Sequence, residues 1–265
     1  MGKILAVCNR KGGCGKSTSV VNLGASLVKQ GKRVLVIDGD SQNSLTVSLG
    51  VKEPDKLQNT LSTIIADIIG DREINWTAGI INHAEGITLL PSNNLLEGVE
   101  ITLAPLMGRE TVIRQLLEVA SPHFDFVLLD TPPTLDLLTI NALAAAHSVI
   151  IPVAPKFLDA KGLELLLKSV VKVRKHINPN LDIAGILLTM VDKRTKFTKE
   201  IIGMIEEAYG EQIRIFKSQI PHSVRAVEAS ATGKSIFEYD PNGKVALAYA
   251  ALTHELLAEG VLANA

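Results

Sequence analysis

The feature that most constrains the fold is a glycine-rich loop close to the start of the chain. Residues 10–18 read Arg-Lys-Gly-Gly-Cys-Gly-Lys-Ser-Thr, between the apolar run Ile4–Val7 and a helical pattern over Ser17–Gln30. Such a loop between a strand and a helix lets backbone N–H groups close around phosphate oxygens, and the helix N-terminus adds its positive end. The sequence therefore predicts a phosphate-binding α/β protein.

Short apolar runs alternate with helical patterns along the rest of the chain. The predicted strands are Ile4–Val7, Val34–Ile37, Ile87–Leu90, Phe126–Leu129, Val149–Val153, Ile183–Leu188 and Ile213–Phe216. The predicted helices are Ser17–Gln30, Leu57–Ile69, Glu110–Ala120, Leu137–Ala146, Ala160–His176, Thr198–Tyr209 and Lys244–Glu259. Strands with apolar side chains at successive positions are covered on both faces, which indicates parallel pairing. We therefore expect a doubly wound, mainly parallel sheet flanked by helices on both faces.

Composition supports one large aliphatic core. Hydrophobic residues make up 46% of the 265 residues and aromatics only 4%, and no stretch reads as a linker, so we expect residues 1–265 to form a single domain.

The N-terminal apolar run is too short for a signal peptide, which predicts a cytoplasmic protein. The uncharged stretch Leu137–Pro155 is interrupted by polar residues and proline, and favours a buried helix and strand over a membrane span.

Two cysteines and a net charge of −1 limit other functions. Cys8 and Cys14 have no second pair and no histidine cluster beside them, so we expect reduced thiols and neither a zinc site nor a disulfide. A near-neutral chain has no basic surface all over, so any nucleic-acid contact needs a local basic patch.

The loop departs from the usual phosphate-loop pattern at its first position. Arg10 stands where that pattern has glycine, and an extra lysine, Lys11, opens the loop. Lys16 is expected to reach the β- and γ-phosphates of a nucleotide, and the Ser17 hydroxyl to ligate Mg²⁺. The loop residues expected to contact the nucleotide are Lys11, Gly12, Gly13, Cys14, Gly15, Lys16, Ser17 and Thr18.

This Lys-Gly-Gly-x-Gly-Lys-Ser pattern resembles the deviant Walker A motif of the ParA and MinD ATPases, a branch of the P-loop NTPases. In that family the extra lysine crosses a dimer interface to touch the partner's ATP. The resemblance therefore implies that Lys11 and Lys16 are both catalytic, with Lys11 acting like an arginine finger on the phosphoryl group. No helix-turn-helix precedes the loop, so the resemblance is to the small form of the family.

Two further motifs of the family end in carboxylates. The segment 34–42 is similar to the family's Asp-x-Asp-Pro-Gln motif, with Ser41 in place of proline, and the resemblance implies that Asp40 positions the attacking water. Asp38 would support the Mg²⁺ shell. The segment 126–133 resembles a Walker B strand, in which Asp130 holds Mg²⁺ through a water. A carboxylate ending a buried strand can also merely cap the next turn, and that reading stays open for Asp38 and Asp40.

Two later segments also resemble ParA patterns: residues 189–195 are similar to Thr-Met-x-Asp-x-Arg-Thr, and residues 220–229 to Ile-Pro-x-x-Val-Arg-x-x-Glu-Ala. In relatives the Ile-Pro segment lies along the adenine, which makes Pro221 a base-contact candidate. Arg194 and Arg225 correspond to arginines of a non-specific DNA surface that forms on dimerisation. Lys193, Lys196 and Lys199 extend that patch. Grouped cations can neutralise phosphates without reading bases, although charge alone also fits a solvated helix face.

The resemblance implies a slow ATPase that serves plasmid or chromosome segregation. Its MgATP-bound sandwich homodimer would bind nucleoid DNA non-specifically and leave it when a ParB-like partner stimulates hydrolysis. A ParA- or MinD-like ATPase that positions another cargo remains the alternative. The tail 253–265 is acidic, without lysine or arginine, and so argues against a MinD-type membrane helix and for a protein without a membrane partner. An iron–sulfur reductase would need cysteines well beyond the loop.

Overall fold

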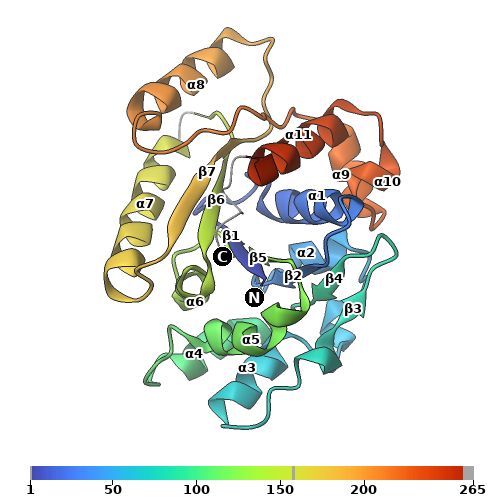
Figure 1. The fold of residues 1–265 in the computed structure, drawn as a ribbon, viewed down its shortest axis with the longest axis vertical. Helices are drawn as coiled ribbons and strands as arrows, with labels where there is room; N and C mark the ends of the chain where they lie inside the picture. The colour runs from blue at the N-terminus through green and yellow to red at the C-terminus, as the bar shows by residue number, and fades with distance from the viewer. Residues whose placement is uncertain (1, 157–158, 259–265) are drawn as a thin grey trace.

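The computed structural model describes residues 2–156 and 159–258, and within them a seven-stranded sheet runs through the centre (Figure 1). Its strands are β1 (Lys3–Val7), β2 (Val34–Asp38), β3 (Ile81–Asn82), β4 (Thr88–Leu90), β5 (Phe126–Asp130), β6 (Ser148–Val153) and β7 (Asp182–Leu188). Their order is β3-β4-β2-β5-β1-β6-β7. The pair β3–β4 is antiparallel and the other neighbours are parallel. The carboxyl ends of six strands therefore meet at one edge.

Helices cover both faces of this sheet. They are α1 (Lys16–Lys29), α2 (Ser44–Ser48), α3 (Leu61–Ile69), α4 (Leu95–Leu103), α5 (Val112–Ala120), α6 (Leu137–Ala145), α7 (Asp159–His176), α8 (Lys196–Tyr209), α9 (Val224–Ala231), α10 (Ile236–Tyr239) and α11 (Lys244–Ala258). Figure 1 shows α1, α9, α10 and α11 on one side and α3 to α7 on the other. The predicted fold class, a doubly wound and mainly parallel α/β sheet, is confirmed.

The strand β1 illustrates how the two faces are built. Ile4 and Ala6 join the core cluster that packs against α3 to α8, whereas Leu5 and Val7 join the cluster beneath α1 and α11. All five β1 residues are buried. A strand covered on both sides needs apolar residues at successive positions, which is why the central strands could be recognised as short continuous apolar runs.

The predicted strand Ile213–Phe216 is wrong as a sheet strand. Only Ile215 forms an isolated parallel bridge, opposite Ile186, through two backbone hydrogen bonds. The next backbone donors, those of Lys217 and Ser218, go to the carboxylate of Glu255 instead of to a neighbouring strand. The ladder therefore stops after one residue.

Several helix boundaries differ from the predicted ones, and several short elements were not predicted. The helix expected from Leu57 begins at Leu61, because Thr60 and Thr63 form a reciprocal capping box. The sequence prediction missed β3, α2, α4, α9 and α10. It also missed the three single-turn helices Pro54–Lys56, Trp76–Gly79 and Ser121–His123. The last residue of the predicted helix Lys244–Glu259 lies outside the described residues.

The uncharged stretch Leu137–Pro155 folds as helix α6 followed by strand β6, as predicted. Across residues 2–156 and 159–258, none of the helices combines the length and the hydropathy that a membrane crossing requires.

Candidate functional site

The glycine-rich loop connects β1 to α1 at the carboxyl edge of the sheet. Gly13 and Gly15 have φ angles of 69° and 84°, a left-handed conformation that side chains oppose, so glycine is needed for the loop to turn. Gly15 is also the N-cap residue of α1. Lys16 is the first residue of that helix, and its Nζ donates a hydrogen bond to the Lys11 carbonyl at 3.2 Å. The loop thus curls around the ammonium group that is expected to meet phosphates.

Hydrogen bonds to the neighbouring chain segments hold the loop in place. The Asn9 amide donates to the Pro152 carbonyl at 2.6 Å, and its oxygen accepts from the Lys11 N–H at 3.1 Å. On the other side, the Thr189 hydroxyl donates to the Cys14 carbonyl at 2.8 Å. The loop is therefore fixed to the ends of both β6 and β7.

Two of the predicted carboxylates lie side by side at this edge. In the sheet register Asp38 of β2 is directly opposite Asp130 of β5, and Asp130 is opposite Val7 at the start of the loop. Asp38 is fully buried and its carboxylate accepts hydrogen bonds from the Thr46 N–H at 2.8 Å and the Thr46 hydroxyl at 2.6 Å. A third comes from the Asp40 N–H at 3.2 Å. Asp38 therefore anchors α2, which agrees with its capping role.

Asp130 is buried with an unsatisfied oxygen. Its Oδ1 accepts from the Thr131 N–H at 3.1 Å, but its Oδ2 has no hydrogen-bond partner. Burial, and then the Asp38 charge, raise the pKa of Asp130 to about 8, although the Ser17 hydroxyl and the Lys16 ammonium oppose the rise. Burial also raises the pKa of Asp38 to about 6. A buried acceptor without a donor, beside a second carboxylate and a serine hydroxyl, suits a hydrated divalent cation.

Asp40 follows β2 at the same edge of the sheet. It is 8% exposed, its Oδ1 accepts from the Gln42 N–H at 3.0 Å, and the residue lines a cavity of about 520 Å³. Both sequence interpretations of Asp40 are therefore compatible with its position, because the side chain caps a turn and also borders the cavity.

This cavity is bounded by the loop, by the segment after β7 and by α9 and α11. Of the loop residues predicted to bind nucleotide, Gly12, Gly13, Gly15, Lys16, Ser17 and Thr18 line it, together with Pro221. Lys11 and Cys14 do not line it. Cys14 is buried, and its thiol donates to the Lys11 carbonyl. Asp38 and Asp130 are buried and are not among the described residues that line the cavity.

The sequence matches known proteins over almost its whole length. A family model described as an AAA domain matches residues 2–183. The chain is 40% identical over 260 residues to the sporulation initiation inhibitor protein Soj of Bacillus subtilis, covering 98% of this chain and 100% of Soj. It is 33% identical to the chromosome partitioning protein ParA of Caulobacter vibrioides, covering 96% and 94%. The chain belongs to the ParA/MinD family of P-loop ATPases.

A solved structure of a protein from Mycobacterium smegmatis matches the fold of this family member. It is named cobyrinic acid a,c-diamide synthase and contains ADP and magnesium. The TM-score is 0.86 at 33% identity, and the match covers 100% of this chain and 97% of the other. A second structure of the same protein contains an ATP analogue and magnesium.

The two cysteines of this ParA/MinD family member are free thiols, and both are buried. Burial raises the pKa of Cys8 to about 12, so that thiol stays protonated at neutral pH.

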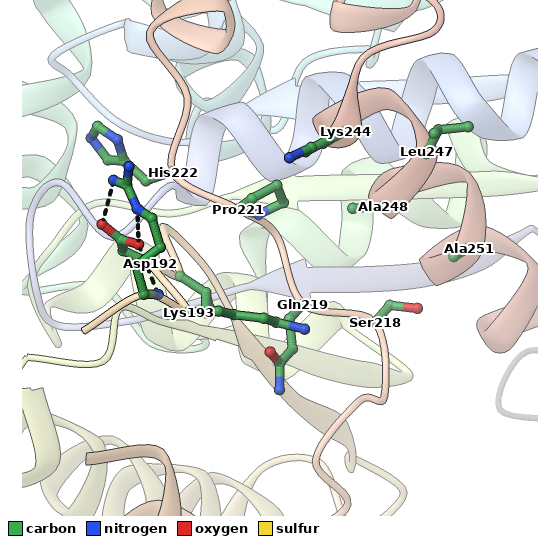
Figure 2. Close-up of a pocket in the computed structure, with 12 residues that line it drawn as sticks. Asp192, Lys193, Ser218, Gln219, Pro221, His222, Lys244, Leu247, Ala248 and Ala251 are labelled. Atoms are coloured by element: carbon green, nitrogen blue, oxygen red, sulfur yellow. Dashed lines mark hydrogen bonds and ion pairs between the residues drawn. The ribbon is translucent and has the colours of Figure 1, made fainter. Parts of the chain in front are cut away.

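A second cavity, of about 720 Å³, lies behind the base-contact candidate (Figure 2). Pro221 and His222 line both cavities. Lys193 and Arg194 line the second one opposite α11, which contributes Lys244, Leu247, Ala248 and Ala251. Figure 2 shows Lys193 and Lys244 on opposite sides of Pro221. Two of the predicted DNA contacts are therefore neighbours of the nucleotide cavity, separated from it by one segment of chain.

The predicted DNA-contact residues are all exposed. Arg194 forms an ion pair with Asp192 at 2.7 Å, which holds the pKa of that carboxyl at about 2, and Arg225 lies 3.6 Å from Asp240. Lys196 and Lys199 lie in the first turn of α8, whereas Arg225 is on α9. Only Lys193 and Arg194 are brought together at one cavity.

Sequence reasoning missed several residues that shape the site. Thr46 holds Asp38, Asn9 and Thr189 hold the loop, and Tyr249 lines the nucleotide cavity while hydrogen-bonding the Ser19 hydroxyl at 3.1 Å. Thr189 stands in the Thr-Met-x-Asp pattern, which could have indicated a role. The sequence carries no local signal for Tyr249, which lies 230 positions from its partner.

Proposed function

We propose that this chain is an ATP-dependent partition ATPase that acts in plasmid or chromosome segregation. The observation that carries the proposal is the cavity in which the deviant loop, Asp40 and Pro221 meet. The match to the chromosome partitioning protein ParA, which covers 96% of this chain, supports the role in segregation. The similar solved structure is named a synthase, so the similarity to it supports the nucleotide site but not the role in segregation. We further propose that residues 1–265 work as one domain.

In this proposal the nucleotide lies along the cavity from the loop to Pro221. Backbone N–H groups of Gly13 to Ser17 bind the phosphates, and Lys16 exchanges its hydrogen bond with the Lys11 carbonyl for one with the β- and γ-oxygens. Pro221 contacts the base. Ser17, Asp38 and Asp130 would hold Mg²⁺, which neutralises charge on the phosphates when bound. The unsatisfied Asp130 oxygen supports that assignment.

Hydrolysis in this proposal needs a positioned water and an added positive charge. Asp40 borders the cavity with a carboxylate already oriented by the Gln42 N–H, so it can orient a water in line with the γ-phosphate. Lys11 supplies the charge from the partner subunit of an ATP-bound sandwich homodimer. Turnover is slow until a ParB-like protein stimulates it.

The dimer is proposed to bind nucleoid DNA in the cytoplasm without sequence preference. Arg194, Arg225, Lys193, Lys196 and Lys199 are exposed and would contact phosphates. A ParA/MinD-like ATPase that positions another cargo is the alternative, and it shares the nucleotide site but not the need for DNA. The acidic tail of the chain lies outside the described residues from position 259 on.

Replacing Lys16 tests the nucleotide site. Lys16→Ala should abolish ATP binding, because the lysine is the loop cation that meets the β- and γ-phosphates. Binding is measured with a fluorescent ATP analogue in the presence of Mg²⁺. Lys172→Ala, an exposed position on α7 away from the cavity, is the control and should bind as the unaltered protein does. Unchanged affinity in Lys16→Ala would rule out this site.

A further inference from the structure

Glu255 on α11 is a buried carboxylate with an unusually complete set of donors. It accepts from the Lys217 N–H at 2.9 Å, the Ser218 N–H at 3.0 Å and the Ser218 hydroxyl at 2.9 Å. The Arg214 guanidinium lies 3.3 Å away, and the Glu255 side chain is only 8% exposed. Burial alone would raise the pKa of Glu255, but the hydrogen bonds from Lys217 and Ser218 outweigh it and lower the pKa below the ordinary value. The group is therefore ionised at neutral pH.

The segment that Glu255 holds runs directly into the wall of the nucleotide cavity. After Ser218 the chain continues through Gln219 and Ile220 to Pro221, which faces that cavity on one side and the second cavity on the other (Figure 2). The Ile220 N–H donates to the Leu188 carbonyl at 2.8 Å, and the Ile220 carbonyl accepts from the Val191 N–H at 2.9 Å. The wall is thus fixed to the end of β7 by Ile220 and to α11 by Glu255.

The phosphate end of the cavity is fixed by different contacts. Asn9 and Thr189 hold the loop through β6 and the end of β7, and neither bonds to Glu255 or to the residues it holds. A change at Glu255 should therefore move the base-facing wall and leave the loop in place. Hydrogen bonds weaken steeply with misalignment, so a small shift of this wall affects recognition of a base edge.

We propose that Glu255 is a positioning residue: from α11 it sets the wall that faces the nucleotide base, and thereby the preference for ATP over GTP. The inference rests on the proposed nucleotide site and adds a specificity determinant that lies outside it. Adenine and guanine differ in the hydrogen-bond donor and acceptor at one ring edge, so a wall segment held in a fixed position binds one base more tightly than the other. Without the Glu255 anchor, the affinities for the two bases become more similar.

The test compares nucleotide binding and turnover in Glu255→Gln and the unaltered protein. The amide keeps the shape but turns an N–H group toward the backbone donors of the held segment, which leaves a donor unpaired. Dissociation constants for ATP and GTP are measured with Mg²⁺ by competition against a fluorescent nucleotide. The ATP-over-GTP preference should fall by about tenfold, the KM for ATP should rise by a similar factor, and kcat at saturating ATP should stay within about twofold.

Asp125→Asn is the matched control. Asp125 also accepts from a backbone N–H, that of Arg33 at 2.8 Å, and pairs with the Arg33 guanidinium at 2.9 Å, but it lies just before β5, at the opposite edge of the sheet. Asp125→Asn weakens a hydrogen bond of the same kind at a place far from the cavity. It should lower the stability of the protein but leave the ATP-over-GTP ratio unchanged. An equal drop in preference in both variants would overturn the positioning role.

Ser218→Ala keeps the proposal testable if Glu255→Gln does not fold. It removes only the hydroxyl donor at 2.9 Å and should lower the preference in the same direction by a smaller factor. If Glu255→Gln folds and its ATP-over-GTP ratio is unchanged, the inference is overturned. If Glu255→Gln does not fold, an unchanged ratio in Ser218→Ala overturns it. An unaltered protein that binds ATP and GTP equally also overturns it. If the unaltered protein binds no nucleotide, the proposed function itself fails.

Discussion

The Asp38–Asp130 pair places two carboxylates at buried positions at the same edge of the sheet. The two residues lie opposite one another in adjacent strands. Loss of hydration raises the pKa of Asp38 to about 6, and loss of hydration followed by the Asp38 charge raises the pKa of Asp130 to about 8. Perturbed carboxylates of this kind cluster at functional sites, because the groups that chemistry requires are costly to the empty fold. Three donors to Asp38 offset part of this cost.

Asp40 should separate binding from hydrolysis. Asp40→Ala is expected to keep ATP affinity within about threefold while lowering turnover by at least about 10²-fold, because orienting a water stabilises the transition state more than the ground state. Affinity is measured by equilibrium binding, and turnover by phosphate release. Gln42→Ala, at the neighbouring cavity position whose N–H orients Asp40, keeps that N–H and is the control. Normal phosphate release from Asp40→Ala would assign the role to another group.

At this scale, motif spacing and the family resemblance predicted residues that the structure places at one cavity. Lys16, Ser17 and Asp40 were found because the chemistry requires those residue types at those positions, and all three line the cavity. Thr46 could not be found in this way. It holds Asp38 because α2 folds back over the end of β2, and that contact depends on tertiary structure.

The sequence predicted the strands that are covered on both faces of the sheet better than it predicted the other elements. Six predicted strands are present because apolar residues at successive positions leave few alternatives. The segment 213–216 has the same apolar character, but its following donors bind Glu255 and it forms a single bridge. The helices α2, α9 and α10 are short and take their stability from packing on α1 and one another, which periodicity does not reveal.

A glycine contact fixes α9 against α2. Gly233 follows the C-cap of α9 with φ 71°, and a Cβ built there would come within 2.6 Å of the Gly50 Cα. Gly31 follows the C-cap of α1 with φ 76° and has open space around it. Both are left-handed C-terminal positions that favour glycine, but only Gly233 also requires close approach of two backbones.

This pair gives a matched stability test. Gly31→Ala should lower the free energy of unfolding by about 1 kcal/mol, the cost of a left-handed alanine. Gly233→Ala should cost about 2–4 kcal/mol, since the backbone contact must also open. Urea denaturation followed by circular dichroism measures both. Equal destabilisation by the two substitutions would show that separating α9 from α2 costs little free energy.

At the scale of the whole molecule, all the chemistry lies at the carboxyl edge of the parallel sheet. The loop follows β1, Asp38 and Asp130 end β2 and β5, and the segment 189–195 follows β7. Connections between parallel strands place loops at this edge, so one face of the protein carries the site. If a second subunit joins there, it covers the nucleotide and can add its own Lys11.

Replacing Lys11 tests whether a second subunit joins at this edge. Lys11→Ala should lower the ATP-dependent dimer fraction and reduce hydrolysis by about 10³-fold, while ATP binding to the monomer is preserved, since the proposed contact is made across the interface. Light scattering with MgATP and with MgADP measures the dimer, and Lys172→Ala again serves as the control. An unchanged dimer population would argue that Lys11 acts within its own subunit.

The surface arginines decide whether this ATPase acts on DNA. Arg194 and Arg225 each have an aspartate nearby, but both arginines are exposed, and exposed ion pairs contribute so little that a DNA phosphate can replace the aspartate. Because the whole chain carries a net charge of −1, one subunit has little attraction for DNA, and we expect binding only when MgATP places two patches on one face.

Changing both arginines to alanine should therefore weaken binding to any duplex and lower the salt slope by about one unit for each DNA phosphate that is no longer neutralised. Two unrelated duplexes are titrated at several salt concentrations, with MgATP and with MgADP. The control replaces Arg72 and Arg174, two exposed arginines paired with Asp67 and Asp182 elsewhere on the surface, and should keep the slope of the unaltered protein. If the unaltered protein binds neither duplex, or the Arg194 and Arg225 variant keeps its affinity and slope, the basic residues form a solvated face and the cargo is not carried on DNA.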